Sequence, residues 1–274
     1  MNVLEINNLC FSYGSGRKGD PLRPILHGIS FSMEEGESVG LVGANGAGKS
    51  TLLKLICGLL DPSEGSVSVS GIKLQKDTLG AVRRELGYVF QDADNQLFTS
   101  SVHDDVAFAP RNYGFSPSET EEAVDRALKA VRLEGLKDRP VYRLSGGEKK
   151  LASIATVLSV ESRLILMDEP TVALDPRNRR TLMGIVNSLP CAKLIASHDL
   201  DFIFDTCRRT ILLSGGKAVF IGDTEKVLRD RQLLEGHGLE LPLSFSRPRA
   251  APPPAGADPE LDPNGETIIN DLNK

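Results

Sequence analysis

The stretch LVGANGAGKSTLLKLICGLL, residues 41–60, decides the fold of this chain. A short apolar run precedes GANGAGKST (43–51), and an apolar helical pattern follows it and ends at Gly58. This order predicts a strand, a glycine-rich loop and a helix. In such a loop the glycines let backbone N–H groups converge on an anion, and the helix N-terminus adds partial positive charge. The stretch therefore predicts an α/β fold that binds the phosphates of a nucleotide.

The same loop carries side chains that a bound nucleotide needs. We expect Lys49 to reach the β- and γ-phosphates and the Ser50 hydroxyl to be a ligand of Mg²⁺. The residues expected to bind the nucleotide here are Gly43, Ala44, Asn45, Gly46, Ala47, Gly48, Lys49, Ser50 and Thr51.

A second motif, RLILMDEP (163–170), predicts a buried strand that ends in two carboxylates. Open α/β sheets bind ligands at the carboxyl ends of their strands. Asp168 would hold Mg²⁺ there, directly or through water, and Glu169 would polarise an attacking water. A strand followed by an acidic turn is the alternative, but the phosphate loop upstream favours the catalytic interpretation.

Further strands are indicated along the chain. Residues 1–42 alternate in hydrophobicity, as half-buried strands do. The apolar runs 164–167 and 194–196 suit parallel strands that are buried on both faces. Residues 209–222, RTILLSGGKAVFIG, predict a β-hairpin that turns at its two central glycines.

A long helix and a terminal tail differ from these strands. Residues 116–133 predict a helix because Ser116 can cap it, Glu119 completes a capping box, and apolar residues recur at helical spacing. From about residue 239 the chain is rich in proline, so we expect a flexible tail over 239–274 that forms no packed core.

Composition narrows the class of protein. The net charge of −5 argues against a nucleic-acid-binding protein, which would usually carry a basic surface. The four cysteines show no metal-ligand spacing and are expected to be reduced thiols of a cytosolic protein. Because no apolar run reaches the roughly 18 residues of a membrane-spanning helix, a function at the membrane would need a separate membrane-spanning chain.

LSGGEKK (144–150) adds a second anion-binding loop. Its Ser-Gly-Gly leads into a predicted helix from Glu148, and a helix N-terminus can bind phosphate. One nucleotide rarely needs two such loops within a subunit. We therefore expect Ser145 and the amides of Gly146 and Gly147 to bind the γ-phosphate of a nucleotide held by another copy.

With these motifs, residues 1–235 closely resemble the ATP-binding cassette (ABC) ATPases. The resemblance implies an α/β fold with a P-loop RecA-like core, an N-terminal antiparallel β-subdomain and an inserted α-helical subdomain at about 93–158, within an ATPase domain over 1–238. It also implies ATP and Mg²⁺ as cofactors and hydrolysis of ATP to ADP and phosphate. The implied roles are adenine stacking by Tyr13, catalysis by Glu169, His198 and Gln91, Mg²⁺ binding by Ser50, Gln91 and Asp168, and action on the partner copy's nucleotide by Ser145, Gly146, Gly147, Glu148 and Asp175.

One branch of the family is matched more closely. QDADNQLF (91–98) resembles the energy-coupling-factor type, which includes cobalt and nickel importers. There Gln91 would contact Mg²⁺ and the attacking water, and its loop would link the ATP core to the helical subdomain. Leu97, Phe98 and Phe108 would pack at a groove that accepts a coupling helix of a membrane partner. Ordinary core packing of Leu97 and Phe98 is the alternative.

The chain departs from the family pattern in two places. PTVALDP (170–176) carries Val172 and Ala173 at positions where the family prefers other small residues, and we expect both to be tolerated. LSGGE (144–148) matches the signature of the family. Leu151 replaces the arginine that usually follows LSGGEKK, which weakens any expectation of a salt bridge there.

The resemblance predicts a peripheral motor subunit on the cytoplasmic face of the cell membrane. Two copies, or one copy and a related cassette subunit, would close over ATP and drive integral membrane coupling and solute-binding subunits. Cobalt or nickel is the expected cargo, and no nucleic acid is expected as a partner. A vitamin cargo and a non-transport ABC ATPase of DNA repair or translation are the alternatives.

Chain length bears on the last alternative. About 95 residues separate Lys49 from Leu144, which leaves no room for the long coiled-coil arms of a repair ATPase. Translation-type members carry two cassettes in one chain, whereas this chain has one.

Overall fold

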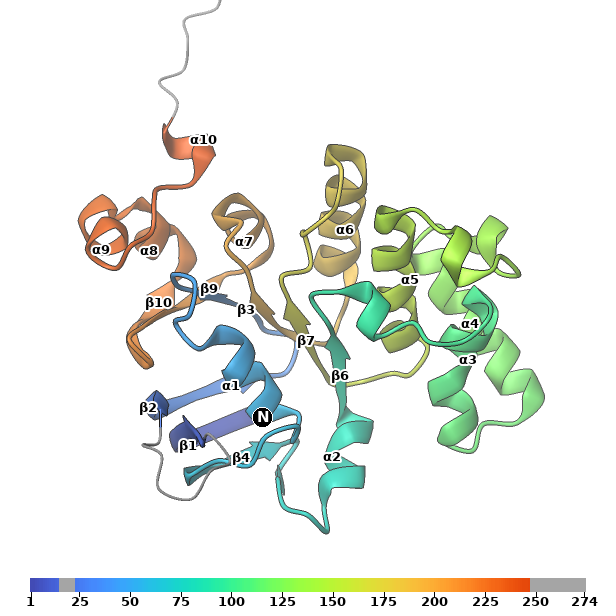
Figure 1. Ribbon diagram of the computed structural model, residues 1–274, viewed down its shortest axis with the longest axis horizontal. Helices are drawn as coiled ribbons and strands as arrows, with labels where there is room; N and C mark the ends of the chain where they lie inside the picture. Colours follow the sequence, from blue (N-terminus) through green and yellow to red (C-terminus); the bar gives the residue numbers. More distant parts are fainter. Residues whose placement is uncertain (15–22, 247–274) are drawn as a thin grey trace, which may run out of the picture.

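The computed structural model describes residues 1–14 and 23–246 (Figure 1). Within these residues the strands form two sheets. The smaller sheet is antiparallel, with the order β2-β1-β4-β5. Its strands are β1 (Asn2–Tyr13), β2 (Arg23–Glu34), β4 (Glu64–Val69) and β5 (Ile72–Lys73).

The larger sheet has the order β10-β9-β3-β8-β7-β6 and is parallel from β9 to β6. The strand β10 pairs antiparallel with β9 across the turn at Gly215 and Gly216, which confirms the predicted hairpin. The strands of this sheet are β3 (Ser38–Val42), β6 (Leu86–Val89), β7 (Leu164–Asp168), β8 (Ala192–Ala196), β9 (Arg209–Ser214) and β10 (Lys217–Asp223).

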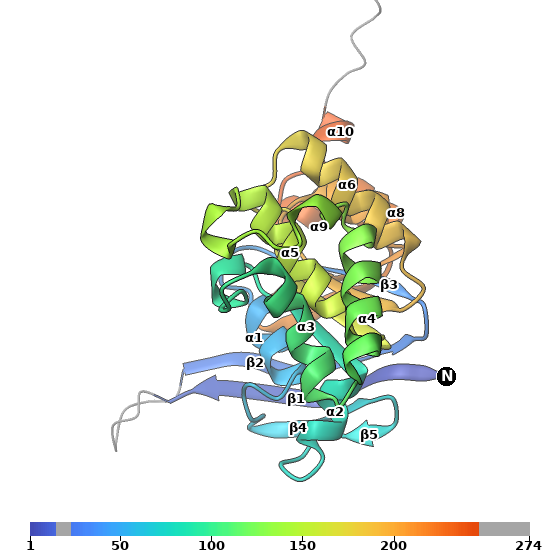
Figure 2. The same ribbon diagram turned by 90° about the vertical axis from the view of Figure 1, so that its right-hand side faces the viewer.

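Helices cover both faces of the larger sheet. The helix α1 (Lys49–Ile56) lies between the two sheets, and α5 (Gly146–Leu158), α6 (Pro176–Ser188) and α7 (Leu200–Thr206) cover the opposite face (Figures 1 and 2). The remaining α-helices of the described residues are α2 (Leu79–Glu85), α3 (Val102–Asn112), α4 (Pro117–Ala130), α8 (Thr224–Arg229), α9 (Arg231–Gly236) and α10 (Leu243–Ser246). Short 3₁₀ helices are η1 (Ala93–Asn95), η2 (Glu134–Leu136) and η3 (Val141–Arg143).

The strand β7 shows why its sequence is continuously apolar. Successive strand residues point to opposite faces. Leu164 and Leu166 belong to the core beneath α1, and Ile165 and Met167 belong to the core beneath α5 and α6. Both faces are buried, as the uninterrupted apolar run predicted.

A helical unit is inserted between the neighbouring strands β6 and β7. It contains η1, α3, α4, η2, η3 and α5, and it lies beside the edge of the sheet (Figure 1). The predicted capping box at the start of α4 is confirmed: Ser116 Oγ accepts from the N–H of Glu119, and the Glu119 carboxylate accepts from the N–H of Ser116.

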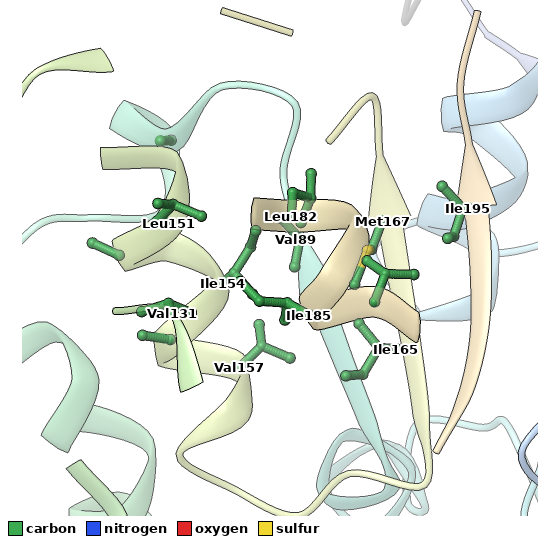
Figure 3. Packing of buried hydrophobic residues seen from close by; sticks show 14 of the residues in the cluster. Val89, Val131, Leu151, Ile154, Val157, Ile165, Met167, Leu182, Ile185 and Ile195 are labelled. Atoms are coloured by element: carbon green, nitrogen blue, oxygen red, sulfur yellow. The ribbon is translucent and has the colours of Figure 1, made fainter. Parts of the chain in front are cut away.

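The helix α5 joins this unit to the sheet. Figure 3 shows Ile154 and Val157 of α5 beside Ile185 of α6 and Ile165 of β7, all within one buried cluster. Leu151, the residue that replaces the usual arginine, is 4% exposed and belongs to the same cluster. An apolar side chain at this position therefore contributes to the core.

The packed part of the chain continues past the boundary expected at residue 238. Leu239, Leu241 and Phe245 pack against the main core, and the carboxylate of Asp201 accepts from the N–H groups of Leu243 and Ser244. Composition alone therefore placed the start of the tail too early. The proline-rich part of the expected tail, 247–274, lies outside the described residues.

The α/β fold class is confirmed, with a P-loop core, an antiparallel β-subdomain and inserted helices. In the part of the chain that the structure describes, no helix has both the length and the apolar character needed to cross a membrane.

Candidate nucleotide site

The phosphate loop connects the end of β3 to the start of α1. Gly48 has a left-handed backbone with φ of 104°, and a Cβ atom there would lie 2.7 Å from Cδ2 of Leu26. Both observations favour glycine. The loop therefore turns sharply, and α1 begins directly behind it at Lys49, with its N-terminus available to an anion.

Lys49 is held inside the loop. Its side chain is 8% exposed, and Nζ donates to the carbonyl oxygen of Gly43 at 2.7 Å and to that of Ala44 at 3.4 Å. Burial lowers the pKa of Lys49, and the nearby carboxylates of Glu169 and Asp168 oppose that shift. The ammonium thus lies among the loop's carbonyl groups, within the loop that is expected to bind the phosphates.

Asp168, at the end of β7, is oriented by two hydroxyl groups. Ser50 Oγ donates to Asp168 Oδ1 at 3.0 Å, and the Tyr88 hydroxyl donates to Oδ2 at 3.3 Å. Burial raises the pKa of Asp168, and the hydrogen bond from Ser50 opposes the rise. Tyr88 was missed by the sequence analysis, because only the pairing of β6 with β7 brings it beside Asp168.

This group of oxygen atoms suits Mg²⁺. Ser50, Gln91 and Asp168 line one cavity and supply hydroxyl, amide and carboxylate oxygens, which are the ligands that Mg²⁺ prefers. Among the described residues, no cluster of three or more His, Cys, Asp or Glu side chains could hold a metal ion. A bound nucleotide would add phosphate oxygens to these ligands, as is usual for Mg²⁺.

Glu169 and His198 lie together at the ends of the neighbouring strands β7 and β8. Glu169 Oε2 lies 2.7 Å from His198 Nδ1 and accepts from the His198 backbone N–H at 3.1 Å and from Ser197 Oγ at 3.2 Å. Glu169 has a positive φ of 46°, which is a strained backbone for this residue type. The turn after β7 thus holds the carboxylate against His198.

A cleft of about 570 Å³ runs beside the phosphate loop, a size that suits a small ligand. Tyr13 lines it and is 40% exposed, and its hydroxyl lies 3.4 Å from Thr51 Oγ1. Residues that were far apart in the sequence meet here. The cleft is lined by Tyr13, Arg23, Ile25, Asn45, Gly46, Ala47, Gly48, Lys49, Ser50, Thr51, Gln91, Glu169 and His198.

The signature residues lie outside this set. Ser145 caps α5: its Oγ accepts from the N–H of Glu148, and the Glu148 carboxylate accepts from the N–H and Oγ of Ser145. A Cβ atom on Gly146 would meet nothing within 4 Å, so the approach to this helix end is open. On Gly147 it would lie 2.5 Å from Nδ2 of Asn178, so this glycine permits close packing on α6.

Asp175 has a local structural contact. Its carboxylate caps α6 by accepting from the N–H groups of Arg177 and Asn178, each at 2.8 Å. The structure thus gathers Tyr13, residues 45–51 of the phosphate loop, Gln91, Glu169 and His198 in one cleft. The predicted site residues that do not line it are Gly43, Ala44, Asp168, Ser145, Gly146, Gly147, Glu148 and Asp175.

The chain is similar to known proteins over most of its length. The family model described as ABC transporter matches residues 26–172. A putative ABC transporter ATP-binding protein of Geobacter sulfurreducens is 45% identical over 89% of this chain and 96% of its own length. The energy-coupling factor transporter ATP-binding protein EcfA of Carboxydothermus hydrogenoformans is 40% identical, over 89% of each chain.

Solved structures show the same fold. CbiO1 from Clostridium perfringens, part of the ABC transporter complex CbiONQ, superposes with a TM-score of 0.75 at 32% identity, covering 86% of this chain and 94% of that one. The ATP-binding cassette MJ0796, solved as a dimer in a post-hydrolysis state with ADP and Pi, has a TM-score of 0.73 at 27% identity, covering 81% and 98%.

The chain belongs to the ABC transporter ATP-binding family. It is an ATPase whose activity is coupled to transport, and subunits of this kind dimerise and work with membrane components.

Proposed function

We propose that this chain is the ATP-hydrolysing motor subunit of an energy-coupling-factor importer, acting on the cytoplasmic face of the cell membrane. The observation that carries the proposal is the segment after β6. There QDADNQLF, the pattern of that branch, forms η1 and presents an exposed phenylalanine at the surface. Similarity to EcfA and to CbiO1 supports the same branch.

In the proposed chemistry, Lys49 and the loop amides hold the phosphates, and Ser50, Gln91 and Asp168 hold Mg²⁺, which would neutralise charge on the phosphate oxygens. The oxygen of a water molecule forms a bond to the γ-phosphorus, and the bond from that phosphorus to the β–γ bridging oxygen breaks. Glu169 takes the proton from the water. Its 2.7 Å contact with His198 supports this role, because His198 fixes the carboxylate beside the cleft.

A second copy would complete each site. The open face at Gly146 and its place at the N-terminus of a 13-residue helix support binding of a γ-phosphate held by the partner copy. Ser145 and Gly147 would bind the same phosphate, and Glu148 and Asp175 would hold the two helix ends that face it. A pair of identical chains is the simplest assembly, and a related cassette subunit could take the place of one copy.

The membrane partner would dock at Phe98 and Phe108. These rings are 65% and 46% exposed and contact each other edge to face at 4.8 Å between centroids. Leu97, by contrast, is 6% exposed and belongs to the core. Of the two interpretations of the QLF stretch, core packing therefore applies to Leu97, and an exposed aromatic pair remains for an apolar partner helix.

The proposed cargo is cobalt or nickel, carried by a separate solute-binding subunit, and this rests on the family resemblance of QDADNQLF alone. A vitamin is the alternative cargo. A non-transport role in DNA repair or translation is disfavoured by the exposed aromatic pair, which gives the chain an apolar docking surface.

Purification from native membranes tests the proposal. A tagged chain is extracted in mild detergent and its integral membrane partners are identified by mass spectrometry, with a Phe98→Ser/Phe108→Ser variant alongside. Leu59→Ser is the matched control, because Leu59 is 50% exposed but lies in the turn after α1, outside the helical unit that carries Phe98 and Phe108. We expect the chain and the control to recover a small transmembrane coupling protein and the double variant to lose it while hydrolysing ATP. Recovery of nucleic-acid machinery, or of no membrane protein, would overturn the transport role.

A further inference from the structure

Lys150 is a buried cation that the nucleotide site does not account for. It lies in α5, six residues after Leu144, and is 2% exposed. Its Nζ donates to the carbonyl oxygens of Phe90 at 2.8 Å and Gln91 at 2.9 Å. Burial lowers the pKa of Lys150 to about 8, so the ammonium is held there at a cost in free energy.

Gln96 also bonds the segment after β6 to α5. Its Oε1 accepts from the N–H of Phe90 at 3.0 Å, and its Nε2 donates to the carbonyl oxygen of Ser153 at 2.7 Å and to Thr156 Oγ1 at 2.8 Å. One amide side chain thus bonds both the segment after β6 and the middle of α5.

We define the loop–helix clip as Lys150, Gln96 and the backbone of Phe90 and Gln91. A surface ion pair between Lys149 Nζ and Asp94 Oδ1, 2.6 Å apart, lies beside it. Gln91, Lys150 and Asp168 line one cavity, so the clip adjoins the candidate Mg²⁺ site. Its hydrogen bonds go to the backbone that carries Gln91 and do not involve the Gln91 side chain.

We propose that Lys150 and Gln96 are positioning residues for Gln91: the loop–helix clip fastens the backbone of Gln91 to α5, so that the Gln91 side chain follows every movement of the signature helix. The inference rests on the proposed role of Gln91 at the Mg²⁺ site. Neither Lys150 nor Gln96 needs to touch the nucleotide for this role.

The loop–helix clip would couple the two nucleotide sites of the proposed dimer. In the proposed dimer, the N-terminus of α5 binds the nucleotide of the partner copy, whereas Gln91 serves the nucleotide of its own copy. A shift of α5 caused by one nucleotide would therefore move a ligand of the other. The hydrogen bonds of Lys150 and Gln96 would carry this coupling, so substitution of either residue should weaken it.

Four variants of the full-length chain test the clip: Lys150→Met, Gln96→Leu, Gln91→Ala and the double variant Gln91→Ala/Lys150→Met. Methionine keeps the apolar stem and removes the charge, a change that buried sites often accept. The readouts are single-turnover ATP hydrolysis, kcat, the KM for ATP and the Mg²⁺ concentration for half-maximal rate. Lys150→Gln, whose amide can still donate a hydrogen bond, tests for partial rescue.

Lys193→Met is the matched control. Lys193 is 3% exposed, burial lowers its pKa, and its Nζ donates to the carbonyl oxygen of Leu189 at 2.7 Å. It therefore resembles Lys150 in burial and bonding, but it lies near the amino end of β8, away from the cleft. Loss of a buried ammonium as such would affect both variants equally.

We expect Lys150→Met and Gln96→Leu to lower kcat about tenfold and to raise the Mg²⁺ concentration needed for half-maximal rate. The KM for ATP should change less than about twofold, because misplacement of a ligand by a fraction of an ångström acts mainly on the reaction step. The double variant should lie within about twofold of Gln91→Ala, because residues that act through one group are not additive. Lys193→Met should match the wild type.

Two results would overturn the clip: a wild-type kcat for Lys150→Met, or a double variant whose loss is the product of the single losses. A wild-type kcat for Gln91→Ala would instead refute the proposed role of Gln91, and the clip with it. The failure of the clip alone is thus distinguishable from the failure of the site on which it rests.

Discussion

Replacement of Glu169 by glutamine should nearly abolish turnover and leave the site's shape intact. The amide oxygen of the introduced glutamine side chain would take the place of Oε2 and accept from the Ser197 hydroxyl and the His198 backbone N–H, as the carboxylate does. The positive φ of 46° costs either residue type about the same. The substitution removes the negative charge and the capacity to take a proton from water.

The size of the effect follows from the role of a general base. Such groups contribute roughly 10²- to 10⁴-fold to rate, so the barrier should rise by about 3 to 5 kcal/mol at 1.36 kcal/mol per tenfold change. Binding of ATP should stay the same or tighten slightly. The phosphate loop is untouched, and one negative charge near the ammonium of Lys49 is removed.

The assay is phosphate release at saturating Mg²⁺ and ATP, with nucleotide affinity measured separately by a fluorescent ATP analogue. Glu85→Gln is the control, because Glu85 pairs with Arg163 outside the cleft. A Glu169→Gln chain that binds ATP and hydrolyses it at more than about a tenth of the wild-type rate would refute the assignment of Glu169 as the base, since such a loss lies below the usual contribution of a general base.

Three further predictions concern stability and reactivity. Ala173 has a left-handed φ of 64°, so Ala173→Asn should raise the free energy of unfolding by about 1 kcal/mol in urea titrations, and an unchanged value would contradict the strain. A chain ending at Gly238 loses the packing of Phe245 and its neighbours, so its free energy of unfolding should be about 3 kcal/mol lower than that of a chain ending at residue 246, which keeps those contacts. Equal free energies of unfolding for the two chains would show that this packing contributes little. Burial raises the pKa of Cys57 to about 11 and that of Cys207 to about 12, so a maleimide at pH 7.5 should label both only after denaturation, and rapid labelling of either in the native chain would count against its burial.

Local patterns predicted much of the fold. The glycine loop, the apolar strand β7 and the capping box of α4 each depend on neighbours within a few residues, so their sequences suffice. Strand order does not follow from such patterns. Only pairing across the sheet places β6 beside β7, and this pairing brings Tyr88 to Asp168.

The roles of Lys150 and Gln96 and the burial of Leu97 were not predicted for the same reason, because they too depend on contacts between segments that are far apart in the sequence. Nothing near Lys150 or Gln96 in the sequence indicates that one buries an ammonium against the backbone of Gln91 and the other bridges to Ser153. Likewise, the QLF stretch is apolar at both Leu97 and Phe98, and only the packing of α5 and η1 decides which is buried.

Because α5 is attached to the edge of the sheet near its carboxyl end, a tilt of this helix would displace its amino end most. The segment that follows α5 is bonded to the sheet where the N–H of Arg163 donates to the carbonyl oxygen of Glu85, so we expect any tilt of α5 to be smallest at its carboxyl end. Thirteen residues at about 1.5 Å each give an arm of roughly 20 Å. A tilt of about 10° would swing Ser145 by about 3 Å and the Gln91 backbone, held part-way along the arm at Lys150, by about 2 Å. A small rotation at this edge of the sheet would thus displace Gln91 far enough to make or break a bond to a metal ion held there.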